Sequence, residues 1–144
     1  MREMNPLTGV MHIRSESGYL KEPEVGTSLI FALVPGDDFP NEVFQILSEK
    51  KVREGIVIFS VGTLWNSTLC NKKEEWILDP DDGLEVTYTE GFFSKENGYF
   101  SHAIETHLID KFGKSSRGTI ISGEVKDLIE GVIKIKKMKR VISS

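Results

Sequence analysis

The chain has 144 residues, 39% hydrophobic and 28% charged, which fits one globular domain with its own core. Its formal net charge of −4 disfavours a protein that grips nucleic acid through a general excess of positive charge. A single cysteine, Cys70, excludes an internal disulfide and a Cys-rich zinc site. No stretch resembles a signal peptide or a membrane span, so we expect a cytoplasmic protein without a membrane partner.

The first part of the chain has little regular patterning. Residues 1–20 are predicted to be a poorly defined N-terminal segment, with a short strand within Met11–Tyr19. A single domain is expected over residues 21–140. Its first clear element is the apolar run Ser28–Val34, whose length and composition predict a buried strand.

A helix should follow this strand. The sequence Pro35-Gly36-Asp37-Asp38 predicts a turn, and Asp37 or Asp38 is expected to cap the next helix. Spacings of three and four residues then place four apolar side chains on one stripe, which are Val43, Phe44, Ile46 and Leu47. The pattern predicts one main helix over about residues 39–51.

The rest of the chain is predicted to be strands. Apolar runs and alternating patterns place them at residues 56–61, 64–69, 76–78, 84–89, 101–108, 119–125 and 131–138. Gly62 is expected to end the first of them. Glu96-Asn97-Gly98 predicts a hairpin turn. The expected fold class is α+β, with a mostly antiparallel sheet of about six to eight strands packed against the one main helix.

Two motifs flank the predicted helix and resemble one family. Gly36-Asp37-Asp38 precedes it, and Gly62-x-x-x-Asn66-x-Thr68-Leu69 follows the next strand. The spacing is similar to that of the PPC domain, which follows the AT-hook in plant nuclear proteins and stands alone in prokaryotes. Further along, Glu85 and Gly91 match another segment of the family pattern. The resemblance covers about residues 28–125.

This resemblance implies an antiparallel sheet packed against helices and a homotrimer as the assembly. It also implies a non-enzymatic binding protein, with DNA or a DNA-binding protein as a further partner. The chain has no Arg-Gly-Arg-Pro type AT-hook, so minor-groove binding of the plant type is not expected.

An alternative is a small-molecule-binding protein or metal-dependent enzyme with a site near His102. Some family members have what resembles a metal site, formed by a His-x-His pair and a later His on neighbouring strands. His102 matches one member of the pair, although Phe100 and Ile104 flank it where the second His is expected, and the position of the later His falls near Thr119. From the residues alone, Glu105 and His107 share one face of a strand, and His102 lies on the other. Zinc is the one cofactor that these residues suggest, with His102, Glu105 and His107 as its candidate ligands. The competing interpretation is an ordinary polar strand face without a metal.

The C-terminal strand is rich in basic residues. Phosphate contact is one interpretation of its cations, which are Lys134, Lys136, Lys137, Lys139 and Arg140. The other is a solvated edge strand, on which lysines discourage aggregation. Both interpretations remain open at this point.

Complete catalytic motifs are absent from the sequence. Gly113-Lys114-Ser115 resembles the end of a P-loop, but Leu108 occupies the position of its first glycine. There is no Gly-x-Ser-x-Gly sequence of the hydrolase type. We therefore assign no catalytic residue.

Overall fold

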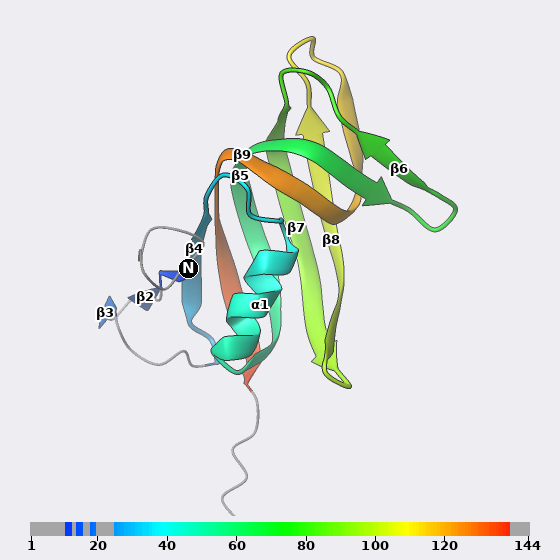
Figure 1. The fold of residues 1–144 in the computed structure, drawn as a ribbon. Coiled ribbons are helices and arrows are strands. Elements are labelled where there is room, and N and C mark those ends of the chain that lie inside the picture. Colours follow the sequence, from blue (N-terminus) through cyan, green and yellow to red (C-terminus); the bar gives the residue numbers. More distant parts are fainter. Residues whose placement is uncertain (1–10, 13, 16–17, 20–24, 139–144) are drawn as a thin grey trace, which may run out of the picture.

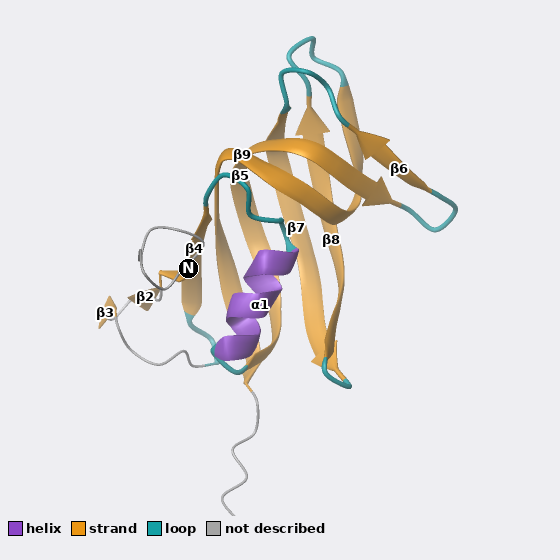
Figure 2. Cartoon of the chain, viewed as in Figure 1, coloured by secondary structure: helices purple, strands orange, loops and turns teal. Residues whose placement is uncertain are grey.

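The computed structural model describes residues 11–12, 14–15, 18–19 and 25–138 (Figure 1). Most of these residues lie in strands, and one short helix accompanies them (Figure 2). The elements are β1 (Met11–His12), β2 (Arg14–Ser15), β3 (Gly18–Tyr19), β4 (Ser28–Leu33), α1 (Asn41–Glu49), β5 (Val52–Cys70), β6 (Glu75–Leu78), β7 (Leu84–Glu96), β8 (Tyr99–Ile109) and β9 (Ser115–Met138). Within the described residues, no helix has the length and apolar character needed to span a bilayer.

Seven strands form one antiparallel sheet in the order β1-β4-β9-β8-β7-β5-β6, and β9 also pairs with β5. The pairings of β5 with β7, β7 with β8, β8 with β9 and β9 with β5 make a closed circuit. The sheet therefore curls on itself where β5 and β9 cross over β7 and β8 (Figure 1). This arrangement confirms the predicted α+β class and the mostly antiparallel sheet.

The two longest strands were each expected as two shorter ones. Gly62 does not end β5, because it pairs with Ile129 of β9 and the strand continues to Cys70. It has a φ of +147°, and a Cβ at this position would lie 1.9 Å from the carbonyl oxygen of Leu128. Irregularities in the β5–β9 register bend both strands without interrupting them. The glycine thus allows close approach of two strands.

Helix α1 covers one side of the sheet, which we call the inner face (Figure 2). Its four predicted stripe residues, Val43, Phe44, Ile46 and Leu47, are all buried, although the helix is shorter than predicted. The Phe44 ring packs 5.7 Å from that of Phe93 on β7 and 5.1 Å from that of Phe100 on β8. These contacts fix the helix across the β7–β8 hairpin.

The prediction that Asp37 or Asp38 caps this helix is wrong. The N-cap residue is Pro40, and no side chain caps the helix. The carboxylate of Asp37 instead accepts a hydrogen bond from the Val34 N–H, and that of Asp38 accepts one from the Gly123 N–H. Both acids are therefore used to shape the preceding turn.

Candidate functional site

The first family motif forms a turn that docks on β9. The Gly36 N–H donates to the Val125 carbonyl at 3.0 Å, and the Val125 N–H donates to the Asp37 carbonyl at 2.8 Å. Asp38 adds an isolated antiparallel bridge to Glu124. The turn is thus held as an extra, very short strand along the curled part of the sheet.

The carboxylate of Asp38 joins three segments of the chain. Its Oδ1 accepts from the Gly123 N–H at 3.1 Å, and its Oδ2 accepts from the Asn41 side-chain amide at 2.8 Å. The same Asn41 amide donates to the Ile121 carbonyl at 3.1 Å. This network ties the turn and the start of α1 to β9.

A cavity of about 380 Å³, which we call the motif cavity, opens beside this turn. The first motif contributes Gly36, Asp37 and Asp38 to its wall, and the second contributes Asn66 and Thr68 from β5. The remaining lining residues are Ile77, Ser122, Gly123 and Glu124. Two motifs that lie apart in the sequence therefore meet at one surface of the fold.

Four other motif residues lie outside the lining of this cavity, and one of them, Leu69, is fully buried in the core. Gly62 and Gly91 are positions of close strand approach, since a Cβ on Gly91 would lie 2.3 Å from the Ala103 carbonyl oxygen. Glu85 is exposed on β7 and pairs with Ile109 of β8. The two glycines act through packing.

A model of the Plants and Prokaryotes Conserved (PCC) domain matches residues 20–135. The chain belongs to this family. The match spans the motif turn, α1 and nearly all of the sheet, so the family assignment rests on most of the fold. No protein with a curated description matches the chain at a significant level.

Solved structures share the PCC fold at low sequence identity. A proposed DNA-binding protein from Ralstonia eutropha JMP134 superposes with a TM-score of 0.71 at 10% identity, covering 89% of this chain and 84% of that one. A proposed DNA-binding protein from Bacteroides thetaiotaomicron gives 0.69 at 15% identity, covering 83% and 85%. A plant- and prokaryote-conserved protein from Pyrococcus horikoshii gives 0.67 at 19% identity, covering 81% and 83%. These similarities extend the shared fold to bacteria and archaea.

The candidate metal ligands divide between the two faces of β8. His102 lies on the inner face, 5.1 Å from the Phe44 ring, and its Nδ1 accepts from the Ile104 N–H at 3.3 Å. Burial lowers the pKa of His102 below its ordinary value. Glu105 and His107 lie together on the opposite face, which we call the outer face, with 3.0 Å between Oε2 and Nε2. In the described part of the chain, no three His, Cys, Asp or Glu side chains gather as a metal site.

Two residues that the sequence did not single out join Glu105 and His107. The Tyr88 ring lies 4.8 Å from the His107 ring, and its hydroxyl donates to the Glu90 carboxylate, which raises the pKa of Tyr88. Glu90 stands directly opposite Glu105 in the β7–β8 register. Counting outward from the Asn97-Gly98 turn would have revealed this pairing. We call these four residues the outer-face polar cluster.

The basic C-terminal strand does not lie at an edge. Lys134 of β9 is flanked by Ser28 of β4 and Ile56 of β5, so the edge-strand expectation is wrong. Lys134, Lys136 and Lys137 are exposed, and Lys137 approaches the Glu54 carboxylate to 3.4 Å. Two of the five predicted phosphate contacts, Lys139 and Arg140, lie outside the described residues.

Large apolar side chains are exposed on the outer face of the sheet. Val57 and Phe93 are buried on the inner face, and a register irregularity between Val57 and Phe59 leaves the consecutive side chains of Ile58 and Phe59 both exposed. Five of the outward side chains are 42–47% exposed, and these are Ile58, Phe59, Val61, Tyr88 and Phe92. We call them the outer apolar patch. Their clustering on two paired strands is typical of a surface that another protein covers.

Proposed function

We propose that this PCC-family chain acts in the cytoplasm as a non-enzymatic, homotrimeric binding protein whose further partner is DNA or a DNA-binding protein. The observation that carries the proposal is the outer apolar patch. Removing apolar surface from water yields roughly 25 cal/mol per Å², so covering this patch by a second copy is favourable. The number of copies, three, follows the family resemblance.

The composition of the outer face suits such an interface. Ile58, Phe59 and Val61 of β5 supply apolar surface next to Phe92 of β7. The polar cluster around Glu105 lies beside them on β7 and β8. An apolar centre with polar groups at its margin is the usual anatomy of a protein interface.

The proposed DNA contact rests on local charge. Net charge is negative, yet Lys134, Lys136 and Lys137 are exposed together at the end of β9. A trimer would present this group three times, and phosphate contacts add in their effect on affinity. Two structural relatives described as proposed DNA-binding proteins, from Ralstonia eutropha and Bacteroides thetaiotaomicron, support the same partner.

Self-association is tested by Val61→Glu. A carboxylate at this 46% exposed position is tolerated by a monomer but is desolvated in an interface. We expect the variant to remain folded by circular dichroism and to sediment as a monomer. The control is Ile77→Glu on β6, where the side chain is 68% exposed and outside the patch. An unchanged assembly in Val61→Glu would refute the placement of the interface.

DNA association is tested by a gel shift with duplex DNA at low salt. Replacing Lys134, Lys136 and Lys137 by glutamine should weaken binding and flatten its dependence on salt concentration. Lys72 and Lys73, in the exposed β5–β6 turn, provide a control substitution of the same type. An absence of any shift with the unsubstituted chain would remove DNA from the proposal and leave self-association intact.

A further inference from the structure

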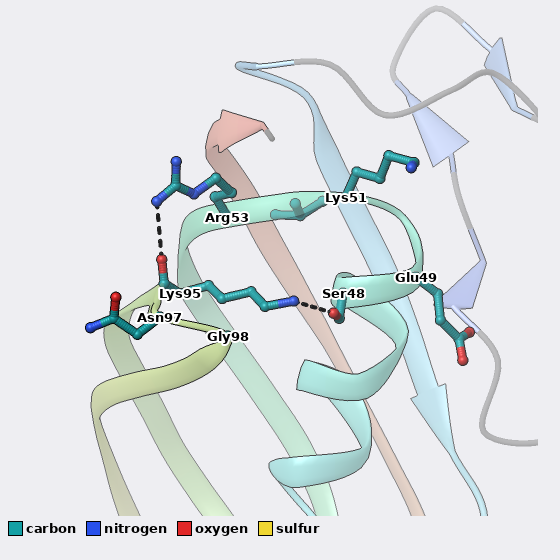
Figure 3. Close-up of a pocket in the computed structure, with 8 residues that line it drawn as sticks. Ser48, Glu49, Lys51, Arg53, Lys95, Asn97 and Gly98 are labelled. Atoms are coloured by element: carbon teal, nitrogen blue, oxygen red, sulfur yellow. Dashed lines mark hydrogen bonds between the residues drawn. The ribbon is translucent and has the colours of Figure 1, made fainter. Parts of the chain in front are cut away.

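A second cavity lies at the end of the molecule opposite the curled part of the sheet. It has a volume of about 610 Å³ and is bounded by the end of α1, the start of β5 and the β7–β8 turn (Figure 3). We call it the hairpin pocket. Its lining residues are Ser48, Glu49, Lys51, Val52, Arg53, Lys95, Asn97 and Gly98.

The charge of the hairpin pocket is positive. It contains three cations, Lys51, Arg53 and Lys95, and one carboxylate, Glu49. Among the residues that the structure describes, no carboxylate pairs with any of the three cations. Lys95 crosses the pocket and its Nζ donates to the Ser48 hydroxyl, while the Arg53 guanidinium donates to the Lys95 carbonyl at 3.3 Å (Figure 3). The partners of Lys95 and Arg53 are uncharged, since the Lys95 ammonium also lies 5.6 Å from the centre of the Phe100 ring, so the positive charge of the pocket is not neutralised by them.

One of these cations, Lys51, has an unfavourable backbone conformation. Lys51 follows the C-cap of α1 with a φ of +64°, a position at which glycine is preferred. A side chain with this φ costs roughly 1–2 kcal/mol relative to ordinary backbone. A favourable interaction with the helix dipole offsets part of that cost. The Lys51 side chain extends away from those of Lys95 and Arg53 (Figure 3), so it adds positive charge at the rim of the pocket.

We propose that the hairpin pocket binds a small anion that carries a phosphate or pyrophosphate group. Its volume falls within the range of small-molecule sites, about 300–1,000 Å³. Guanidinium and ammonium groups are the usual protein partners of phosphate, and Asn97 and Ser48 add neutral hydrogen-bonding groups. The pocket lies within one chain, so binding requires neither self-association nor DNA.

Titration with inorganic pyrophosphate tests this site, with NMR detection of the backbone amides at ionic strength held constant with sodium chloride. We expect saturable shifts at Lys51, Arg53, Asn97 and Gly98. The double substitution Lys51→Gln with Arg53→Gln should raise the Kd for pyrophosphate by about tenfold, since each exposed charge contributes a factor of up to about five to affinity. Glu49→Gln should strengthen binding because it removes the only carboxylate of the pocket.

The matched control removes two lysines far from the pocket, Lys73 and Lys114, by the same change to glutamine. Its Kd for pyrophosphate should equal that of the unsubstituted chain. A control as weak as the double variant would overturn the site, as would shifts that never saturate. A short DNA duplex that moves the same amides at lower concentration than pyrophosphate would assign the phosphate to nucleic acid and overturn the small-ligand proposal.

Discussion

Replacement of Gly62 by alanine probes the shortest contact that a Cβ would make at any glycine in the described part of the chain. The new Cβ would lie 1.9 Å from the Leu128 carbonyl oxygen, whereas real Cβ contacts essentially never fall below 3.0 Å. The β5 and β9 backbones must therefore separate by more than 1 Å at this point. The φ of +147° adds a backbone cost of roughly 1–2 kcal/mol, and overpacking adds about 1–3 kcal/mol.

The expected loss is about 2–5 kcal/mol out of a typical total of about 5–15 kcal/mol. For a chain of this size, that corresponds to a Tm lower by roughly 5–15 °C. Thermal unfolding followed by circular dichroism measures it, at one fixed protein concentration because association raises the apparent stability.

Substitutions at two further glycines separate the backbone cost from the packing cost. Gly36→Ala has only the backbone cost, since φ is +94° and nothing lies within 4 Å of the new Cβ. Gly91→Ala has only the packing cost, with the Ala103 carbonyl oxygen at 2.3 Å. Gly62→Ala should be more destabilising than Gly36→Ala. Equal stability of these two variants would refute the argument from close strand approach.

Three other substitutions have defined outcomes. Asp38→Ala removes the side-chain acceptor of the Gly123 N–H and one of the two acceptors of the Asn41 amide. It should lower the free energy of unfolding by about 1–3 kcal/mol in urea titrations, with a smaller loss for Asp38→Asn. Thr106→Val should raise the free energy of unfolding by about 1 kcal/mol, because the Thr106 hydroxyl is fully buried without a partner among the described residues. Thr87→Val is the control and should give no gain in stability, because the Thr87 hydroxyl donates to the His107 carbonyl. Burial lowers the pKa of His102 in the folded state, so the unfolded state binds more protons as the pH falls below about 6.5 and stability is lost toward acidic pH. His102→Phe should remove that part of the pH dependence, and His107→Gln should retain it; an unchanged pH profile in His102→Phe would contradict the assignment.

Local patterns predicted the elements whose side chains follow one simple period. The apolar run at Ser28–Val34 matches β4, and the apolar stripe of α1 is buried as predicted. The Asn97-Gly98 turn has positive φ at both residues, as a two-residue hairpin turn requires. The same logic failed for β5 and β9, since register irregularities shift the alternation and Gly62 was interpreted as an interruption. A glycine that ends a strand and one that permits close approach look alike in sequence.

The candidate sites were predictable only where they depend on one strand. The odd spacing of His102 and His107 correctly placed them on opposite faces of β8. The motif cavity needs β5, β9 and the turn after β4 to meet, and the hairpin pocket needs the end of α1 to meet the β7–β8 turn. Those meetings depend on long-range pairing, which the sequence pattern of any one segment does not specify.

The mass of the protein in solution tests the central proposal of self-association most directly. Sedimentation equilibrium at micromolar concentration should give a mass near 49 kDa, three times the 16.2 kDa of one chain. The outer apolar patch would then be covered in the assembly. A mass of 16.2 kDa across the same concentrations would contradict the trimer and the interface built on Ile58, Phe59 and Val61.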